Sequence, residues 1–284
     1  MKAIAYDIMS YRKRDHPCWR NSRIGRDLKP EGICKKINRK TKGLLPVHFA
    51  GRPCEMSEIL SLPHGLRTVE DCAHASETMY HGSHAGTFGD CGVLSFYSTK
   101  NLPTGDGGMI LTDDDSLAAW FKLISQQGVT TVAWQRLSAG GYRHYDVAEI
   151  GFKYNMMDLQ AAIGIHQLRR VERRWQRRQE IWNRYDDGLR DLPVELRSEP
   201  REGTRHALHL YTILIDKEKC GISCDEFMVR LHRDNIGVEV HYRQLADHSA
   251  YQNQFGWRTG TMAKRRTSEP ADCFIAAFCQ IDGQ

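Results

Sequence analysis

A short stretch around Lys100 constrains this chain more than any other part of it. The apolar run Val93–Tyr97 precedes this lysine, a turn-rich segment follows at 103–108, and a second apolar run comes at 109–111. Two short apolar runs separated by Gly and Pro predict a strand, a loop and a strand. A lysine walled by apolar residues can be desolvated, which makes its amine a usable nucleophile toward a carbonyl. The alternative is an ordinary solvated loop lysine, so the residues that accompany Lys100 decide between the two.

The composition excludes several classes of protein. The chain has 284 residues, 40% hydrophobic and 26% charged, which is typical of a globular protein with a proper core. Its net charge of +5, from 40 basic and 35 acidic residues, is too small to indicate a nucleic-acid partner by itself. No apolar run approaches the roughly 18 residues of a membrane span, so no membrane partner is expected.

The N-terminus and the cysteines indicate a cytoplasmic protein. Residues 1–7 are too short in apolar residues and too soon charged for a signal peptide. The nine cysteines are scattered and form no Cys-x-x-Cys pair. Reduced thiols are therefore expected rather than a disulfide framework.

Strand and helix patterns alternate in the first two thirds of the chain. Apolar runs at 44–49 and 66–71 predict buried strands, and the spacing at 56–62 predicts a helix between them. This alternation favours an α/β large domain with a mainly parallel sheet over residues 1–192, of which 1–43 are poorly patterned. Asp71 and Lys100 both follow strands, at the carboxyl ends where such sheets bind ligands.

A long helix and a smaller unit follow. The apolar stripe predicts a helix over 157–189, and Leu192-Pro193 makes a plausible boundary. Strands at 208–215 and 238–242 and a helix at 224–234 predict a small α+β C-terminal domain over 193–284. The long helix also carries six arginines, at 169, 170, 173, 174, 177 and 178. These form a solvated face, a face toward a second subunit or, less favoured, a phosphate-binding ridge.

Five polar residues along the large domain form a candidate site. They are the carboxylate of Asp71, the imidazole of His74, the hydroxyl of Ser95, the amine of Lys100 and the amide of Asn155. Pyridoxal phosphate requires a lysine that forms a Schiff base, an acid that keeps the pyridine nitrogen protonated, and polar groups that hold the phosphate. The five residues match that requirement.

Here the sequence resembles the DegT/DnrJ/StrS family of sugar aminotransferases, which adopt the type I, aspartate-aminotransferase-like fold of pyridoxal-phosphate-dependent transferases. The matching stretches are LLPVHFAG (44–51), VEDCAHA (69–75), GTFGDCGVLSFYSTKNLPTGDGGMI (86–110) and GFKYNMMDLQAAIG (151–164). The resemblance runs from about residue 40 to residue 260, and SFYSTKNLPTGDGG is its most specific part.

The resemblance implies a role for each candidate residue. Lys100 looks like the lysine that forms the Schiff base with pyridoxal 5'-phosphate and moves the proton. Asp71 would pair with the pyridinium nitrogen, His74 would lie against the ring, and Ser95 would bind the phosphate. Asn155 is similar to the family asparagine that reaches the cofactor of the neighbouring subunit, which implies a homodimer with shared active sites.

The resemblance also implies the reaction and its substrates. His241 and Tyr242 match a family stretch near the sugar-nucleotide site. The expected reaction moves an amino group from an amino acid, with L-glutamate as the donor that the resemblance implies, to a keto group of a nucleotide-linked sugar in polysaccharide or secondary-metabolite biosynthesis. A lysine rather than a histidine at position 100 favours transamination over the family's dehydratase branch.

The sequence departs from the family pattern at both ends. Residues 1–43 contain nothing like the family's Gly-Thr-Ser phosphate loop at a helix N-terminus, and residues 263–284 lack the expected apolar C-terminal strand and helix. The expectation is a truncated or degenerate member. One alternative is a non-catalytic remnant that dimerises or binds a sugar nucleotide, and a second is a basic nucleic-acid-binding protein that uses the arginine-rich helix.

Simpler interpretations exist for the individual residues. Cys72, His74, His81 and His84 fit no standard zinc spacing, so no metal site is expected. Asp71 and Asn155 can each cap a helix, and Ser95 can be a satisfied core hydroxyl. The turn at 105–108 needs only glycines with positive φ and no ligand.

Overall fold

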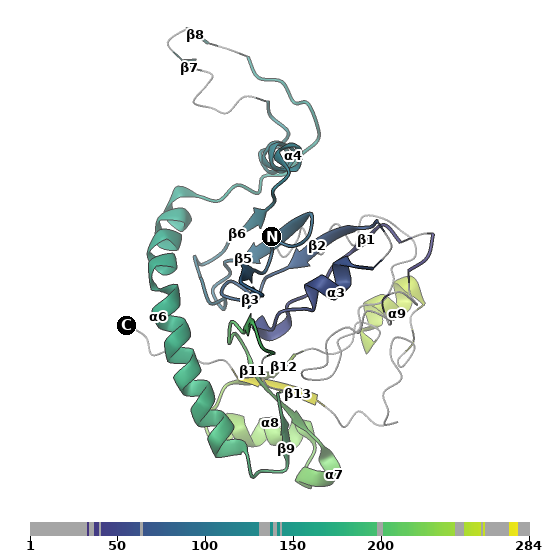
Figure 1. Ribbon diagram of the computed structural model, residues 1–284, viewed down its shortest axis with the longest axis vertical. Coiled ribbons are helices and arrows are strands. Elements are labelled where there is room, and N and C mark those ends of the chain that lie inside the picture. The colour runs from purple at the N-terminus through teal and green to yellow at the C-terminus, as the bar shows by residue number, and fades with distance from the viewer. Residues whose placement is uncertain are drawn as a thin grey trace.

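The computed structural model describes the chain with gaps. The described residues are 33, 37–39, 41–62, 65–130, 137–138, 141–142, 144–197, 201–241, 247–256, 258 and 273–277. Two sheet-containing regions lie one above the other in Figure 1, and a single long helix, α6 (Asp158–Leu189), runs alongside both. The predicted helix over 157–189 is therefore confirmed within one residue.

The first region contains the sheet that carries Lys100. Its strands are β1 (Gly43–Leu44), β2 (Arg67–Asp71), β5 (Cys91–Ser95) and β6 (Gly108–Leu111), in that order. β1, β2 and β5 are parallel, and β6 is antiparallel to β5, which confirms the predicted mainly parallel sheet. The predicted strand at 44–49 is shorter than expected, because Pro46 has no N–H to donate. Only Val47 pairs again, with Asp71.

Close backbone packing shapes the connection into β5. Gly86 has a φ of +94°, and a Cβ on Gly92 would lie 2.2 Å from the Cα of Gly86. Neither position therefore accepts a side chain without moving the backbone. The register pairs Asp71 with Val93, so the carboxyl ends of β2 and β5 lie side by side.

Short helices and hairpins surround this sheet. The described helices here are the 3₁₀ helix η1 (Phe49–Gly51), α3 (Met56–Leu60) and α4 (Asp115–Ser125). The N-terminus of α4 is capped by Asp114, whose carboxylate accepts hydrogen bonds from Ser116 and Leu117. A second sheet joins β3 (Met79–Tyr80), β4 (Ser83–His84) and β10 (Thr204–Arg205), and β7 (Leu137–Ser138) pairs with β8 (Gly141–Tyr142) at the far end of the molecule in Figure 1.

The second region is an antiparallel sheet with helices beside it. Its order is β12 (Val238–Val240), β13 (Cys273–Ala277), β11 (Tyr211–Ile215) and β9 (Val194–Leu196). The helices are α7 (Lys217–Cys220), α8 (Cys224–Arg233) and α9 (Ser249–Phe255). This arrangement matches the predicted small α+β unit.

The C-terminal strand corrects one expectation. The sequence suggested that residues 263–284 lack an apolar strand, but β13 lies between β11 and β12 and pairs with both. The run from 273 to 277 is short and continuously apolar, so it has no period that distinguishes a strand from an irregular apolar run.

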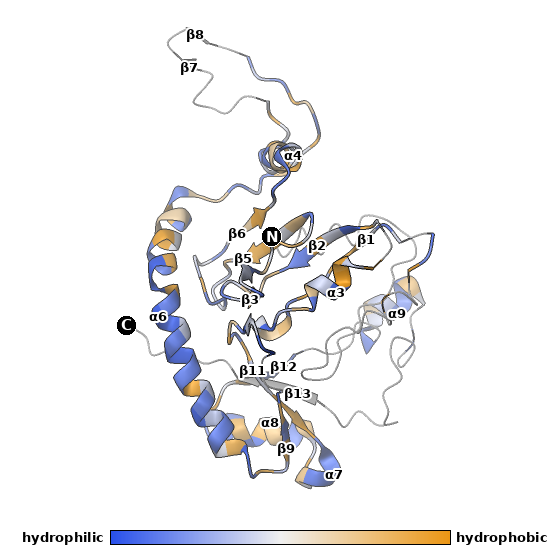
Figure 2. Cartoon of the chain, in the orientation of Figure 1, coloured by the Kyte–Doolittle hydropathy of each residue, from blue (hydrophilic) through white to orange (hydrophobic). Residues whose placement is uncertain are grey.

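The largest buried cluster lies between α6 and the second sheet. Trp182 of α6 packs with residues of β11 and with Cys224 and Val238, and Trp175 and Leu189 add to it from the same helix. In Figure 2 most of α6 is hydrophilic, with apolar residues at its N-terminal end and again near its C-terminal end. The helix thus connects the two regions through its second half.

The structure bears on the expected reduced cysteines and on the expected absence of a membrane span. Cys54, Cys72, Cys91 and Cys220 are free thiols, whereas Cys224 is disulfide-bonded, which departs from the expected set of reduced cysteines. Among the described residues, no helix combines the length and the apolar character that crossing a bilayer requires.

Candidate active site at the carboxyl ends of β2 and β5

The loop that carries Lys100 is held by backbone hydrogen bonds. The N–H of Lys100 donates to the carbonyl of Tyr97 at 2.9 Å. The N–H of Thr104 donates to Phe96, and the N–H of Phe96 donates to Gly107, both at 2.9 Å. These bonds close the loop directly beyond β5 and hold the backbone of Lys100 to it. The glycines of this turn, at 105 and 107, have positive φ as predicted.

Asp71 is the last residue of β2 and is half-buried. Its Oδ1 accepts a hydrogen bond from the N–H of Ala73 at 3.0 Å. Residues 72–78 form turns rather than a helix, so the alternative role of Asp71 as a helix cap is wrong. The second carboxylate oxygen accepts no hydrogen bond from the described residues, which leaves it able to accept one from a protonated ring nitrogen.

His74 follows Asp71 in the same turn. Its Nδ1 accepts a hydrogen bond from the N–H of Ala50 at 3.2 Å. Its ring lies 4.5 Å from the ring of His209 and 6.0 Å from that of Phe49, measured between centroids. The imidazole is therefore fixed in orientation by one hydrogen bond and by two ring neighbours.

The amine of Lys100 acts electrostatically on two buried imidazoles. Burial, followed by the charges of Lys100 and Arg178, lowers the pKa of His209 to about 3. Burial also lowers the pKa of His241, and the Lys100 charge contributes to that shift. Both imidazoles are consequently neutral near pH 7 and add no positive charge beside the lysine.

The structure brings most of the predicted residues to one edge of the sheet. Ser95 ends β5, is half-buried, and its Oγ accepts a long hydrogen bond of 3.4 Å from the N–H of Tyr97. The proximity of Lys100 to His241 brings that predicted substrate residue to the same place. Tyr242 lies outside the described residues.

Asn155 does not join this group. It is exposed, and within the described part of the chain no hydrogen bond holds its side chain. The N-cap of α6 is Met157, whose N–H donates to the side chain of Gln160 at 3.0 Å, so the capping role considered for Asn155 is wrong. The neighbouring Met156 lies against Gly107, which places Asn155 next to the turn that follows Lys100.

A buried cluster supports the site from behind. The carboxylate of Glu70 accepts hydrogen bonds from the N–H groups of Gly86, Phe88 and Gly89 and from Nε2 of His48. Burial would raise the pKa of Glu70, but these bonds lower it below its usual value. The glycine-rich segment before β5 is therefore tied to β2 immediately beside Asp71.

Three side chains of this cluster could in principle bind a metal ion, but their ligand atoms are already hydrogen-bonded or protonated. One ligand atom each of His48, Glu70 and Cys72 lie within 4.8 Å of one another. However, the N–H of Cys54 donates to Nδ1 of His48 at 3.0 Å, so Nε2 carries the proton that it donates to Glu70. Burial raises the pKa of the Cys72 thiol, which disfavours the thiolate that a metal would need. The arrangement is a structural hydrogen-bonded pair.

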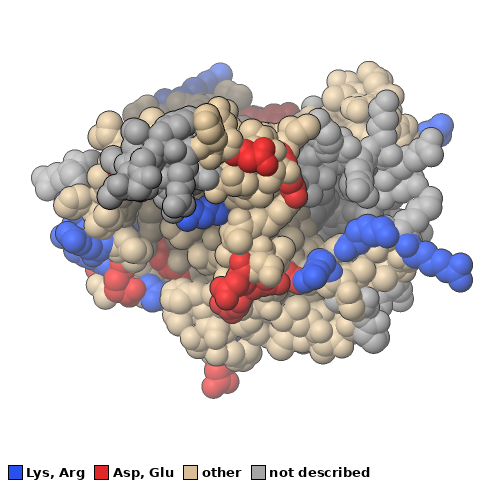
Figure 3. Space-filling view, turned by 90° about the horizontal axis from the view of Figure 1, so that it is seen from above, with Lys and Arg blue, Asp and Glu red and all other residues tan. Residues whose placement is uncertain are grey.

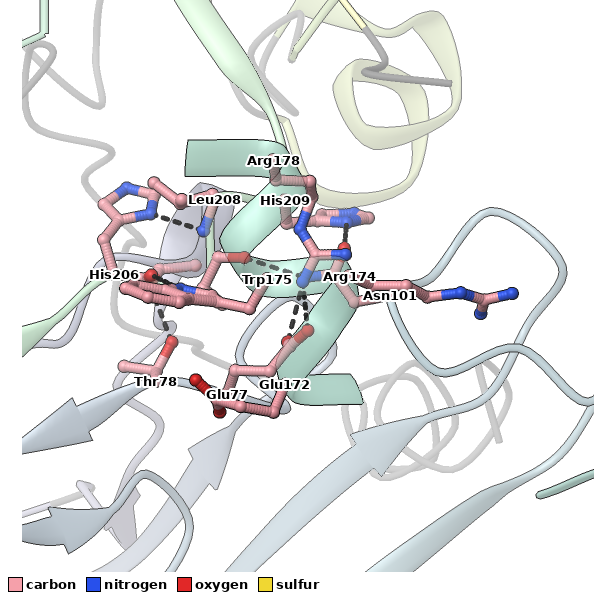
Figure 4. Close-up of polar contacts among 12 residues, drawn as sticks. Glu77, Thr78, Asn101, Glu172, Arg174, Trp175, Arg178, His206, Leu208 and His209 are labelled. Carbon is pink, nitrogen blue, oxygen red and sulfur yellow. Dashed lines mark hydrogen bonds and ion pairs between the residues drawn. The ribbon is translucent and has the colours of Figure 1, made fainter. Parts of the chain in front are cut away.

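Four residues beside Lys100 were missed by the sequence analysis. Glu77 forms a buried ion pair with Arg178 of α6 (Figure 4). Asn101 donates a hydrogen bond to Glu77 and forms a second hydrogen bond with Nδ1 of His209. The only sequence signal was the position of Asn101 directly after Lys100. The predicted solvated arginine face is wrong for Arg178, whose side chain is 4% exposed because it pairs with Glu77.

The other charges on α6 are largely exposed and partly paired. Arg177 forms an ion pair with Glu180, and Arg205 forms one with Glu172. On the face viewed in Figure 3, basic and acidic side chains are interspersed. The ion pairs of Arg177 with Glu180 and of Glu172 with Arg205 are typical of a solvated surface rather than of a phosphate-binding ridge.

Comparisons of the sequence with known proteins give a consistent result. The chain is 40% identical over 236 residues to an uncharacterized protein, MJ1066, of Methanocaldococcus jannaschii, covering 82% of this chain and 61% of that protein. It is 40% identical over 235 residues to the spore coat polysaccharide biosynthesis protein SpsC of Bacillus subtilis, covering 82% and 60%. The chain therefore spans about three fifths of the length of these curated relatives.

Comparisons of the structure agree. A putative sugar aminotransferase, Spr1654, from Streptococcus pneumoniae in its PMP form matches with a TM-score of 0.77 and 25% identity, over 90% of this chain and 69% of that one. Helicobacter pylori PseC, an aminotransferase involved in the biosynthesis of pseudoaminic acid, matches with a TM-score of 0.77 and 25% identity, over 90% and 67%. These matches confirm the expected fold of pyridoxal-phosphate-dependent sugar aminotransferases.

The last comparison concerns the family as a whole. The profile of the DegT/DnrJ/EryC1/StrS aminotransferase family matches residues 26–269, which is most of the chain and includes every candidate site residue named above. The chain belongs to the DegT/DnrJ/EryC1/StrS aminotransferase family.

Proposed function

We propose that the chain acts as a pyridoxal 5'-phosphate-dependent aminotransferase that moves an amino group from an amino acid to a keto group of a nucleotide-linked sugar. L-Glutamate is the proposed donor, and polysaccharide or secondary-metabolite biosynthesis is the proposed setting. The observation that carries the proposal is that His74 and Lys100 both lie close to His209, beyond the carboxyl ends of two neighbouring parallel strands, the first of which ends at Asp71. The names of SpsC and of the sugar aminotransferase Spr1654 support the class of reaction.

The residues present fit the cofactor. A pyridine ring that is protonated on nitrogen needs a carboxylate, and Asp71 has one oxygen that no described residue occupies. The pyridine ring also needs an aromatic side chain to stack against, and the imidazole of His74 is held in one orientation. Ser95 donates no hydrogen bond within the described residues, so its hydroxyl proton can go to a phosphate oxygen.

Each of these residues has a proposed task. When bound, pyridoxal phosphate supplies a ring that withdraws electrons from the carbon bearing the amino group. Asp71 would keep that ring's nitrogen protonated, and His74 would cover one face of the ring. Lys100 would hold the cofactor through its amine and, once the amino group of the substrate has replaced it there, would carry the proton. The nearby imidazoles of His209 and His241 are neutral and add no positive charge beside it.

The substrate side rests on fewer observations. His241 is buried near Lys100, which supports a role close to the reacting atoms. Tyr242 is proposed as its partner in binding the sugar nucleotide. We place the reaction in the cytoplasm, where nucleotide-linked sugars are used.

A homodimer is part of the proposal. The first half of α6 exposes large apolar side chains, among them Leu159 at 74% and Leu168 at 60% exposure. A run of such residues on one helix is typical of a surface covered by another chain. In this dimer, Asn155 of the partner subunit would reach the phosphate of the cofactor, which accounts for an exposed amide that makes no hydrogen bond to the described residues of its own chain.

The decisive experiment follows the bond between Lys100 and added pyridoxal phosphate. We expect the unmodified protein to show a visible absorbance band, and L-glutamate to discharge that band with release of 2-oxoglutarate. Borohydride should remove the band and leave a stable covalent adduct on the peptide that contains Lys100. Lys100→Ala should abolish the band and the product, because no other amine can occupy that position. Asp71→Asn should leave the band but remove most of the product, by about 100-fold, because the ring nitrogen loses its anionic partner.

The control is Lys122→Ala, which removes an exposed lysine on α4 that belongs to no site. It should behave like the unmodified protein. An adduct that survives Lys100→Ala contradicts the assignment of Lys100. A protein without any adduct would instead bind sugar nucleotides or dimerise without transamination.

A further inference from the structure

A buried chain of polar contacts links α6 to the loop of Lys100. Arg178 donates to Oε1 of Glu77 although the two residues are 101 positions apart, and their side chains are only 4% and 2% exposed. Oε2 of Glu77 accepts a hydrogen bond of 2.9 Å from the amide of Asn101. Burial raises the pKa of Glu77, and the Arg178 charge and the Asn101 amide oppose that rise. A buried carboxylate with these two partners fixes both of them in place.

The side chain of Asn101 has no freedom left. Its Nδ2 donates to Glu77 and also to the carbonyl of Ala207, each at 2.9 Å. Its Oδ1 lies 2.9 Å from Nδ1 of His209. Because a flipped amide would point its oxygen at two acceptors, only one orientation satisfies all three neighbours. His209 must therefore carry its proton on Nδ1.

The same contacts orient the groups around the reactive amine. Figure 4 shows Asn101 with His209 on one side and the Glu77–Arg178 pair on the other. The ring of His209, fixed by Asn101, lies against the ring of His74, tilted by 39° and with 4.5 Å between the centroids. Asn101 is also the residue directly after Lys100, in a loop that has no regular secondary structure of its own. Its side chain thus ties the backbone next to Lys100 to residues outside the loop.

We propose that Asn101 is a positioning residue for Lys100, which fixes the lysine backbone against the buried Glu77–Arg178 pair and against His209. This inference rests on the proposed function, because Lys100 must first be the residue that bonds pyridoxal phosphate. Lysine has four rotatable side-chain bonds, so its amine reaches a defined point only if its backbone is held. A displacement of about 1 Å at a reacting group slows a reaction by up to about 100-fold.

The test compares the rate of bond formation with the affinity for the cofactor. The rate is that of borohydride-trapped pyridoxal phosphate on the Lys100 peptide, measured by mass spectrometry. The affinity is that of pyridoxamine phosphate, which has no aldehyde and cannot bond to the lysine. For Asn101→Ala we expect a rate lower by about 10-fold to 100-fold and an affinity within about twofold of the unmodified protein. Thr99→Ala, an exposed change on the other side of Lys100, should alter neither value.

A second pair of variants serves if Asn101→Ala fails to fold. In His209→Asn the new amide nitrogen occupies the position of Nδ1 and can still donate to Asn101. In His209→Gln the amide sits one bond further and cannot. We expect His209→Asn to keep most of the trapping rate and His209→Gln to lose about 10-fold, and equal rates in the two would overturn the inference.

The outcomes separate this inference from the proposed function. If the unmodified protein forms no adduct at Lys100, the proposed function is wrong, and the positioning role of Asn101 is wrong as well. If the unmodified protein and Asn101→Ala form the adduct at the same rate, only the positioning role is wrong. A fall in rate and in pyridoxamine phosphate affinity by the same factor would also overturn it, because the loss would then lie in cofactor binding.

Discussion

In the first half of α6, from Asp158 to Arg170, large apolar side chains face outwards, whereas in the second half, from Val171 to Leu189, they pack against the sheet of the C-terminal unit. Leu159 and Leu168 are 74% and 60% exposed, but Trp182 is 1% exposed. The same contrast holds for arginines, since Arg169 and Arg170 are exposed and Arg178 is buried.

This difference shows that one helix serves two kinds of contact. The second half meets residues of its own chain, and Trp175 donates a hydrogen bond of 2.8 Å to the carbonyl of His206 there. The first half has no comparable cover among the described residues. A continuous apolar stripe on a helix therefore does not reveal which chain it packs against.

Removing the central side chain of the second half should have the largest effect. The ring of Trp182 contacts Tyr211 edge to face at 5.1 Å, and the guanidinium of Arg197 lies 4.6 Å above it. We expect Trp182→Ala to lower the free energy of unfolding by about 3–5 kcal/mol, because the cavity cannot close between a helix and a sheet. Urea unfolding measures this. Leu168→Ala, in the first half, serves as the matched control, and a similar loss in both variants would refute the contrast.

Acid should have the second largest effect, because His206, which packs against Trp182 in the second half of α6, is buried without a charge. Burial, followed by the charges of Arg197 and Arg52, lowers the pKa of His206 from its usual 6.5 to about 3. Between these two values the unfolded chain binds a proton that the folded chain does not, so stability falls as the pH falls below about 6.5. From about pH 7 to pH 5 the expected loss from this group is about 2 kcal/mol.

The pH dependence needs a variant that isolates His206. His206→Asn keeps a side-chain acceptor for the N–H of Leu208 but cannot titrate. The buried His209 remains in both proteins and contributes equally to both curves. We expect the unfolding free energy of the variant to change less with pH, and parallel curves would show that His206 is not kept neutral by burial.

The smallest effect on the folded monomer should come from the first half. Leu159→Ser and Leu168→Ser each remove an exposed side chain, so the free energy of unfolding at low protein concentration should change by no more than about 0.5 kcal/mol. If this half forms the dimer surface, self-association should weaken by about 10-fold or more in sedimentation velocity. Gln176→Ala, an exposed change in the second half, is the control, and unchanged association in the leucine variants would exclude this surface.

Local pattern predicted the elements of the large region well. The strand predicted at 66–71 is observed at Arg67–Asp71, and the strand–loop–strand around Lys100 is confirmed. The strand predicted from residue 208 begins only at Tyr211. The reason is tertiary, because the N–H groups of Ala207 and His209 donate to Gly51 and Ala50 of η1, and Leu208 adopts a φ of +55°. No local rule predicts such a partner.

The division of the chain at 192–193 remains a prediction. Trp182 lies on one side of that boundary in sequence and packs with Ile213 on the other. The roles of Asp71, His74, Ser95, Lys100 and Asn155 toward the cofactor likewise remain predictions, now with their positions known.

The sequence by itself determined the order of strands and loops, the position of Lys100 and Asp71 after neighbouring strands, and the family. These depend on residue type and short spacing, which local physical rules capture. Only the tertiary structure decided which arginine of six is buried, which tautomer His209 adopts, and that Glu77 and Asn101 meet beside Lys100. Those outcomes depend on hydrogen bonds between residues 24 to 108 positions apart. Their free energy depends on burial, and burial is a property of the folded chain.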